Sequence, residues 1–171
     1  MVVSTSIANF TIRTATVTDI PLILSFIKEL AEYEKLSNEV VATEEILAES
    51  LFGERSSSAE VVIGYYKNEP VAFALFFHNF STFLGKPGLY LEDLYVNTEM
   101  RGKGIGKVLI LYLANLAKNR GCGRFEWWVL DWNKSAIQFY HSIGAKPMDE
   151  WTVQRVDGEA LDQLANEFEV S

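Results

Sequence analysis

Apolar residues recur at helical spacing in several stretches of the chain. Leu22, Phe26 and Leu30 fall on one face of a helix over about residues 20–36, and Thr18 and Asp19 offer cap chemistry before it. The same spacing, with glycines marking several of the ends, predicts further helices over 43–53, 105–119, 134–144 and 158–169.

Runs rich in β-branched and aromatic residues predict the strands. These runs cover residues 10–15, 59–66, 71–80, 89–96, 124–132 and 150–156. A polar turn at 67–70 predicts a β-hairpin, whereas 54–58 and 81–88 have the composition of loops. Strands and helices alternate in mixed order, which predicts an α/β fold.

Length and charge narrow the class of protein. The chain has 171 residues, which favours a single domain over 1–171, and its net charge of −8 argues against a nucleic-acid partner. The net negative charge would attract a cationic small molecule, although it could also serve solubility alone.

No apolar run is long enough to span a membrane, so we expect a soluble, cytoplasmic protein. One cysteine, Cys122, leaves no set of thiols for a disulfide or a zinc site, and we expect no metal.

Three glycines at alternate positions, Gly102, Gly104 and Gly106, precede the helix predicted over 105–119. Their spacing fails the dinucleotide fingerprint, and Val108 stands where a Walker loop needs serine or threonine. Arg101 and the glycines instead suit a loop whose backbone N–H groups approach a pyrophosphate. The alternative is a purely structural turn.

Two adjacent acids, Glu92 and Asp93, interrupt an otherwise apolar strand. Because successive strand residues alternate, their side chains are predicted to point to opposite faces of the sheet. One could then serve a cationic substrate while the other meets a structural partner. The alternative is that both are solvated at a sheet edge.

Several sequence blocks in order resemble a known family. They are "YLEDLYV", "RGKGIG", a helix, a strand and "LDWNKSAIQFYHSIGA", and together they resemble the GCN5-related N-acetyltransferases (GNAT). "IKELAEYEKLS" and "STFLGKPGLYLEDLYV" resemble its diamine (spermidine/spermine) and thialysine acetyltransferase group. The resemblance implies a mostly antiparallel mixed sheet with splayed strands and flanking helices, and direct acetyl transfer from acetyl-CoA to a primary amine of a small cation. It also implies a homodimer.

The resemblance also implies which residues form the site. Glu92 would be the base, acting through water, and Tyr140 the general acid. The acetyl-CoA contacts would be Leu94, Tyr95, Val96, Arg101, Gly102, Lys103, Gly104, Ile105, Gly106, Lys107, Asn133, Lys134, Ser135, Ala136 and Tyr140. The substrate contacts would be Tyr33, Glu34, Glu92, Glu126, Trp127, Trp128 and Glu150.

Two other functions compete with this interpretation. A protein-lysine acetyltransferase would favour an open groove over an acid-lined pocket. A non-catalytic acetyl-CoA-binding sensor would have no need of both Glu92 and Tyr140.

Overall fold

The computed structural model describes residues 2–54, 56 and 58–168. It divides into two compact units, the first ending at Trp128 and the second beginning at Val129, and each is described by itself. The single domain expected over 1–171 stays a prediction.

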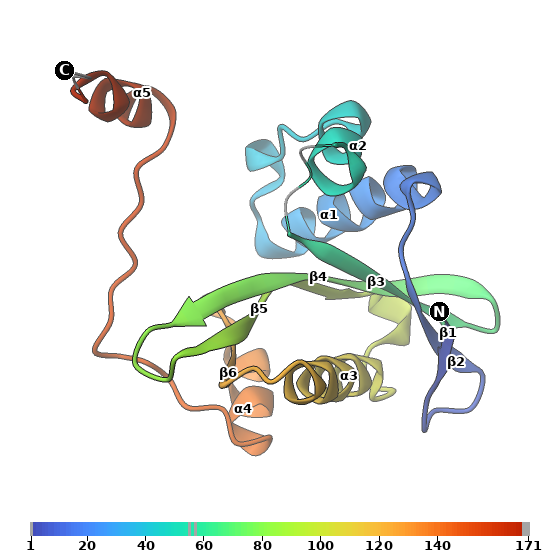
Figure 1. Ribbon diagram of the computed structural model, residues 1–171. Coiled ribbons are helices and arrows are strands. Elements are labelled where there is room, and N and C mark those ends of the chain that lie inside the picture. The colour runs from blue at the N-terminus through green and yellow to red at the C-terminus, as the bar shows by residue number, and fades with distance from the viewer. Residues whose placement is uncertain (1, 55, 57, 169–171) are drawn as a thin grey trace. The chain divides into compact units, whose positions relative to one another are not determined.

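The first unit is built on a six-stranded sheet with the strands in sequence order (Figure 1). The strands are β1 (Val2–Ser4), β2 (Phe10–Thr14), β3 (Glu60–Tyr66), β4 (Glu69–Ser81), β5 (Lys86–Val96) and β6 (Arg124–Trp127). Neighbours are antiparallel throughout, except that β5 and β6 are parallel. The mixed α/β class and the mostly antiparallel mixed sheet are therefore confirmed.

Helices cover both faces of this sheet. α1 (Ile20–Glu34) and α2 (Glu44–Phe52) lie over one face, and α3 (Ile105–Asn119) lies against the other (Figure 1). Pro21 stands in the first turn of α1, where its missing N–H costs nothing, and the Thr43 side chain caps α2 by accepting from the Ile46 N–H at 3.3 Å. Short 3-10 helices cover Val17–Asp19, Ser37–Glu39 and Thr98–Met100.

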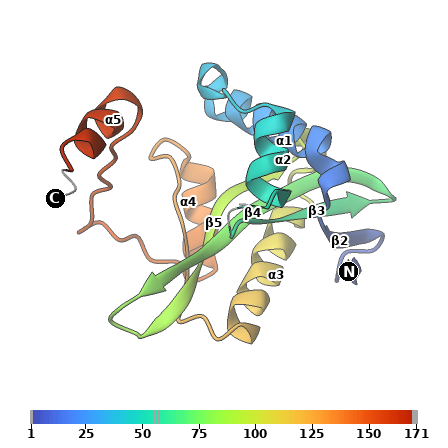
Figure 2. The ribbon, with the colours of Figure 1, turned by 45° about the horizontal axis from the view of Figure 1, so that its top comes forward.

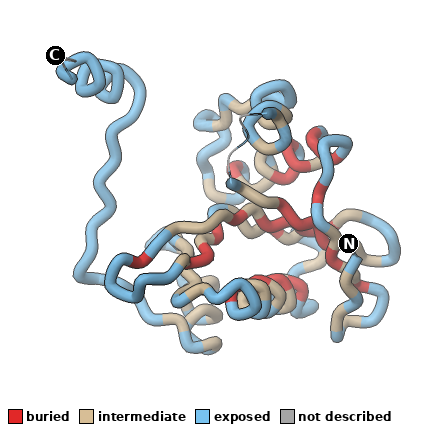
Figure 3. Tube along the Cα trace, in the orientation of Figure 1, coloured by how far each residue is buried: buried red, intermediate tan, exposed pale blue. Residues whose placement is uncertain are grey.

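Two apolar layers hold the helices to the sheet (Figure 3). On the α1 side, Phe26 stacks on Phe73 with ring centroids 5.3 Å apart, and Tyr95 joins the same buried cluster. On the α3 side, Leu109 and Leu113 are fully buried. Each such side chain contributes about 1.5–3 kcal/mol on burial, so these layers fix where β5 lies.

Two helices lie in the described part of the second unit. They are α4 (Lys134–Ser142) and α5 (Gly158–Asn166). Gly144, with φ of 92°, adopts the left-handed conformation just after α4, as glycine at a helix end commonly does.

Several predicted boundaries were wrong. β4 and β5 extend into the predicted loop 81–88, because Ser81 pairs with Lys86 and cross-strand pairing overrides local composition; the hairpin they form is seen best in Figure 2. The strand predicted over 124–132 ends at Trp127, and 150–156 forms no strand in the described part of the chain. A strand needs a hydrogen-bonded neighbour, which composition cannot guarantee. β1 was not predicted, being only three residues long.

The remaining helix boundaries lie close to prediction. α5 ends at Asn166 rather than at 169, and residue 169 lies outside the described residues, as do 55 and 57 of the predicted loop 54–58. No described helix is both long enough and apolar enough to cross a bilayer.

Candidate active site

The edge of β5 that faces β6 is paired over only part of its length. β6 pairs with Gly88 to Leu91, while residues 92–96 continue beyond its end with their other edge held by β4. Within the described chain, this leaves backbone N–H and C=O groups of Leu94 and Tyr95 outside the β5–β6 ladder. An extended ligand can pair with such groups as an added strand.

A β-bulge places Glu92 at the point where this unpaired edge begins. Leu75 pairs with Asp93 and its neighbour Phe76 pairs with Leu91, so Glu92 has no partner of its own in the register. Leu75 packs on the α1 side, which puts Asp93 on that side and Leu91 on the other. Strict alternation is therefore interrupted between Leu91 and Asp93, which would share a face in a regular strand. The opposite faces expected for Glu92 and Asp93 stay a prediction.

The bulge joins Asp93 to an acidic cluster, defined here as Glu34, Glu92 and Asp93. Burial raises the pKa of Asp93 to about 6, and the negative charges of Glu92 and Glu34 add to the shift. Burial also raises the pKa of Glu34, at the end of α1. Glu92 is exposed. No group of three or more acids, histidines or cysteines in the described residues is arranged to hold a metal ion.

The glycine loop leads from β5 into α3 by way of two left-handed residues. Gly102 and Gly104 have φ of 75° and 81°, a region that glycine enters at lower cost than other residues. Gly106 is helical instead, and a Cβ added there would meet only Val96, at 3.8 Å. The first two glycines therefore satisfy the turn, while the third keeps backbone accessible.

The start of α3 presents unbonded donors. The first N–H to bond back within the helix is that of Val108, to the Gly104 carbonyl at 3.0 Å, so the N–H groups of Ile105, Gly106 and Lys107 precede the intrahelical ladder. The helix dipole makes this end favourable for an anion, and Lys103 and Lys107 are exposed beside it.

Arg101 lies differently from these lysines. Its Nε donates to the Val96 carbonyl at 3.0 Å, and its guanidinium carbon lies 4.2 Å from the centroid of the Tyr33 ring. The same carbon is 5.5 Å from the Tyr95 ring centroid. The sequence pattern assigned Arg101 to the anion, and it contained no signal for these aromatic contacts.

Other predicted substrate contacts lie along β6. Glu126 accepts from the Asn79 side chain at 3.0 Å and pairs with Arg124 at 2.7 Å, so its charge already has a partner. The Trp128 ring meets the Tyr90 ring edge-on, with centroids 5.9 Å apart, and Trp127 packs against Phe125.

The second unit holds the remaining predicted residues. Asn133 caps α4, because its Oδ1 accepts from the Ala136 N–H at 3.3 Å and from the Ser135 hydroxyl at 3.2 Å. Tyr140 lies in the last turn of α4 with its ring centroid 5.4 Å from that of Phe139. Lys134 is exposed at the helix start, and Glu150 lies in a turn after the helix.

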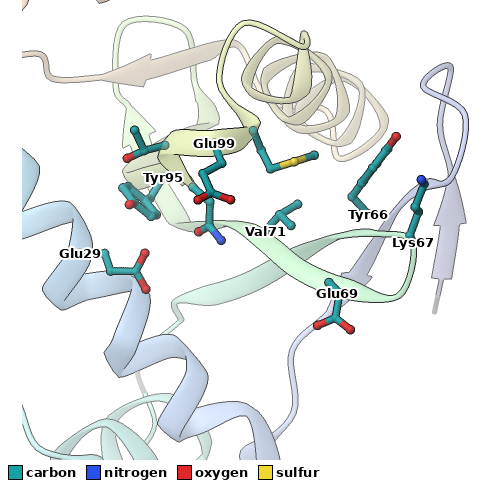
Figure 4. Close-up of a pocket in the computed structure, with 10 residues that line it drawn as sticks. Glu29, Tyr66, Lys67, Glu69, Val71, Tyr95 and Glu99 are labelled. Carbon is teal, nitrogen blue, oxygen red and sulfur yellow. The ribbon is translucent and has the colours of Figure 1, made fainter.

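A pocket of about 490 Å³ opens beside Tyr95 on the α1 side of the sheet. Figure 4 shows Glu29 reaching toward it from α1, with Lys67 and Glu69 on the β3–β4 hairpin. Of the predicted site residues only Tyr95 lines it, so this pocket is separate from the acidic cluster.

Comparison with known proteins decides the family. The model of the acetyltransferase (GNAT) family matches residues 26–145, which include the β5 edge, the glycine loop and α4. The chain belongs to the GNAT family. It is therefore an acetyl-CoA-dependent acyltransferase, as the sequence resemblance predicted.

Relatives within this family are similar over nearly the whole chain. A thialysine N-epsilon-acetyltransferase of Sus scrofa is 41% identical over 92% of this chain and 98% of its own length. An L-ornithine N5-acetyltransferase of Arabidopsis thaliana is 34% identical over 90% of this chain and 86% of its own. Among solved structures, an integron cassette protein from the mobile metagenome of V. cholerae aligns with a TM-score of 0.77 at 28% identity. The alignment covers 92% of this chain and 98% of that one.

The structure adds one residue to the predicted acidic set. Asp93 had been noticed in the sequence without being placed in the site, and the bulge brings it to the side of Glu34. Two acids in an apolar strand were the available signal, but the register shift that orients them depends on the pairing with β4.

Proposed function

We propose that this GNAT enzyme transfers acetyl directly from acetyl-CoA to a primary amine of a small cation, either a lysine-like amine such as thialysine or a diamine or polyamine. The acidic cluster carries the proposal, because it puts negative charge where the unpaired part of the β5 edge begins. Relatives named for thialysine and ornithine acetylation support the same substrate class.

The acetyl-CoA contacts follow from the two unpaired backbone regions. Leu94, Tyr95 and Val96 would pair with the pantetheine arm as a neighbouring strand would. The N–H groups at the start of α3, with Lys103 and Lys107, would hold the pyrophosphate. The capped start of α4, residues 133–136, would supply further contacts.

The chemical step needs a neutral amine. An alkyl ammonium with a pKa near 10.4 is almost fully charged at pH 7, so Glu92 would take its proton through a bridging water. The amine nitrogen then bonds to the thioester carbon, and a β5 amide donates to the developing oxyanion. As the carbon–sulfur bond breaks, the Tyr140 hydroxyl would give its proton to the coenzyme A sulfur, forming a free thiol. The nitrogen would lose its second proton as the amide forms, and that proton would return through solvent to the Tyr140 oxygen.

Asp93 and Glu34 would attract and orient the cation. With a pKa of about 6, Asp93 becomes charged as the pH rises through that value, so amine affinity should increase across the same range. Tyr33, Trp127, Trp128, Glu126 and Glu150 would complete the substrate contacts. Glu126 would share its charge between Arg124 and the substrate.

We propose that the chain forms a homodimer. Leu161 and Leu164 share one face of α5, and an apolar stripe on a short helix calls for a covering surface, which a second copy would provide. Light scattering on the purified chain measures this, and a monomer at all concentrations would refute it. A cytoplasmic location stays a prediction.

The proposed function is tested by thiol release from acetyl-CoA against a panel of amines. The panel contains thialysine, lysine, ornithine, putrescine, spermidine, spermine and a lysine-rich peptide. We expect the highest kcat/KM for one of the small cations. A preference for the peptide would instead identify a protein-lysine acetyltransferase, and tight acetyl-CoA binding without turnover of any amine would refute the proposed substrate class.

A further inference from the structure

Arg101 connects three separate parts of the first unit. Its guanidinium lies 4.2 Å from the Tyr33 ring centroid, at the end of α1, and 5.5 Å from the Tyr95 ring centroid, near the end of β5. Its Nε donates to the Val96 carbonyl at 3.0 Å. The arginine itself stands at the start of the glycine loop, just after the 3-10 helix Thr98–Met100.

The contact with Tyr33 bears on the acidic cluster. Tyr33 immediately precedes Glu34, and α1 ends there because Lys35 adopts a left-handed conformation with φ of 64°. Tyr33 is 37% exposed, so the buried apolar layer alone does not fix the last turn of α1. A planar cation placed over an aromatic ring supplies a directional contact at this point.

We propose that Arg101 is a positioning residue for the amine substrate. By stacking on Tyr33 and Tyr95 it holds the last turn of α1, and with it Glu34, against the bulged part of β5. The amine site and the pyrophosphate loop are thereby joined through one side chain. This inference rests on the proposed function and names a determinant of its substrate affinity.

The pattern of cations around the loop favours this role over direct pyrophosphate binding. The Arg101 head group is engaged by two rings, and its Nε by a carbonyl. Lys103 and Lys107 are exposed next to the α3 N–H groups, and they can neutralise an anion there. Substitution of Arg101 should therefore raise the KM of the amine, whereas substitution of Lys103 should raise the KM of acetyl-CoA.

Steady-state kinetics on Arg101→Gln, Arg101→Lys and Lys103→Gln separate these roles. We expect both Arg101 variants to raise the KM of the amine about three- to tenfold, the range of a partly exposed cation–π contact, with the KM of acetyl-CoA within twofold. Lysine keeps the charge but lacks the planar head group, so it should not restore affinity. Lys103→Gln should raise the KM of acetyl-CoA instead.

The partner ring provides a second arm of the test. Tyr33→Leu should raise the KM of the amine at least as much as Arg101→Gln, because it removes both the stacking partner and a proposed substrate contact. Tyr33→Phe should have a smaller effect because the ring remains, and Tyr33→Leu combined with Arg101→Gln should be no worse than Tyr33→Leu alone. Additive increases in the KM of the amine in the double variant would overturn the proposal. So would an Arg101→Gln variant that raises the KM of acetyl-CoA while the KM of the amine stays unchanged.

Hydrogen exchange keeps the inference separable from the proposed function. If the wild-type chain acetylates none of the amines, the proposed function fails, but the positioning contact still predicts faster amide exchange in residues 32–34 of Arg101→Gln than of Lys103→Gln. Equal exchange in the two variants would refute the contact itself.

Discussion

The pKa of Asp93 predicts that removing its charge stabilises the protein. The folded state raises this pKa from 3.8 to about 6, a difference of roughly 2 units at about 1.36 kcal/mol each. Between these values the folded chain binds more protons than the unfolded chain, so the free energy of unfolding falls as the pH rises through the window. Above pH 7 the wild type therefore carries the full penalty of about 2–3 kcal/mol.

Asp93→Asn lacks this titration and should be more stable than the wild type by that amount at pH 8, while the two converge below about pH 4. For a chain of this length about 1 kcal/mol shifts Tm by about 2–4 °C, so a rise of about 4–12 °C is expected at pH 8. The same substitution should weaken amine binding, since the site loses a charge.

The assay is urea denaturation of both proteins at a series of pH values. Glu69→Gln is the matched control, because it removes a carboxylate from an exposed position on the neighbouring strand and should change stability by less than about 0.5 kcal/mol. A stability difference that is the same at pH 4 and pH 8, or an Asp93→Asn variant less stable than the wild type at pH 8, would refute the claim that the ionised Asp93 carboxylate destabilises the folded state.

Three further predictions concern Asp19, the glycine loop and Tyr140. Asp19→Asn should cost about 2–3 kcal/mol by urea denaturation at pH 7, because Arg13 at 2.7 Å lowers the pKa of Asp19 to about 2; in the wild type this contribution is lost as the pH falls from about 4 to 2. Gly104→Ala should lower Tm by the equivalent of about 1 kcal/mol because Gly104 has a φ of 81°. Gly106→Ala should preserve Tm but weaken the binding of acetyl-CoA, measured by calorimetry, since the added Cβ would occupy space at the anion site. Tyr140→Phe should reduce kcat about 100-fold or more in the thiol-release assay and leave acetyl-CoA affinity within a few-fold; turnover at the wild-type rate would remove Tyr140 from the mechanism.

Strongly periodic segments were the part of the fold that local pattern could predict. α1 and α3 each bury one apolar face. Of the residues predicted to share a face of α1, Phe26 is buried, and Leu22 and Leu30 are half-buried against the same cluster. Strand ends depended on partners instead: β4 and β5 extend because Ser81 and Lys86 pair, and residues 150–156 remain irregular in the absence of a described partner strand. Composition describes a segment, whereas pairing is a property of the whole sheet.

The candidate site divides in the same way. The glycine loop could be predicted from the sequence, because a left-handed backbone at Gly102 and Gly104 restricts the residue type. The bulge at Glu92 could not be predicted from the sequence, because it arises from the register between β4 and β5. That register determines the face on which Asp93 lies. The stacking of Arg101 on Tyr33 joins residues 68 positions apart by sequence number, and no local motif encodes it.

Direct acetyl transfer is the central claim, and mass spectrometry of a single reaction mixture tests it most directly. The chain, acetyl-CoA and the preferred amine are mixed, and the acetylated amine, the released coenzyme A and the intact protein are quantified together. The account predicts one acetylated amine for each coenzyme A released, with the mass of the protein unchanged at every time point. A transient acetylated protein that passes its acetyl group to the amine, for example through Cys122, would contradict direct transfer, and thiol release without an acetylated amine would contradict the proposed reaction.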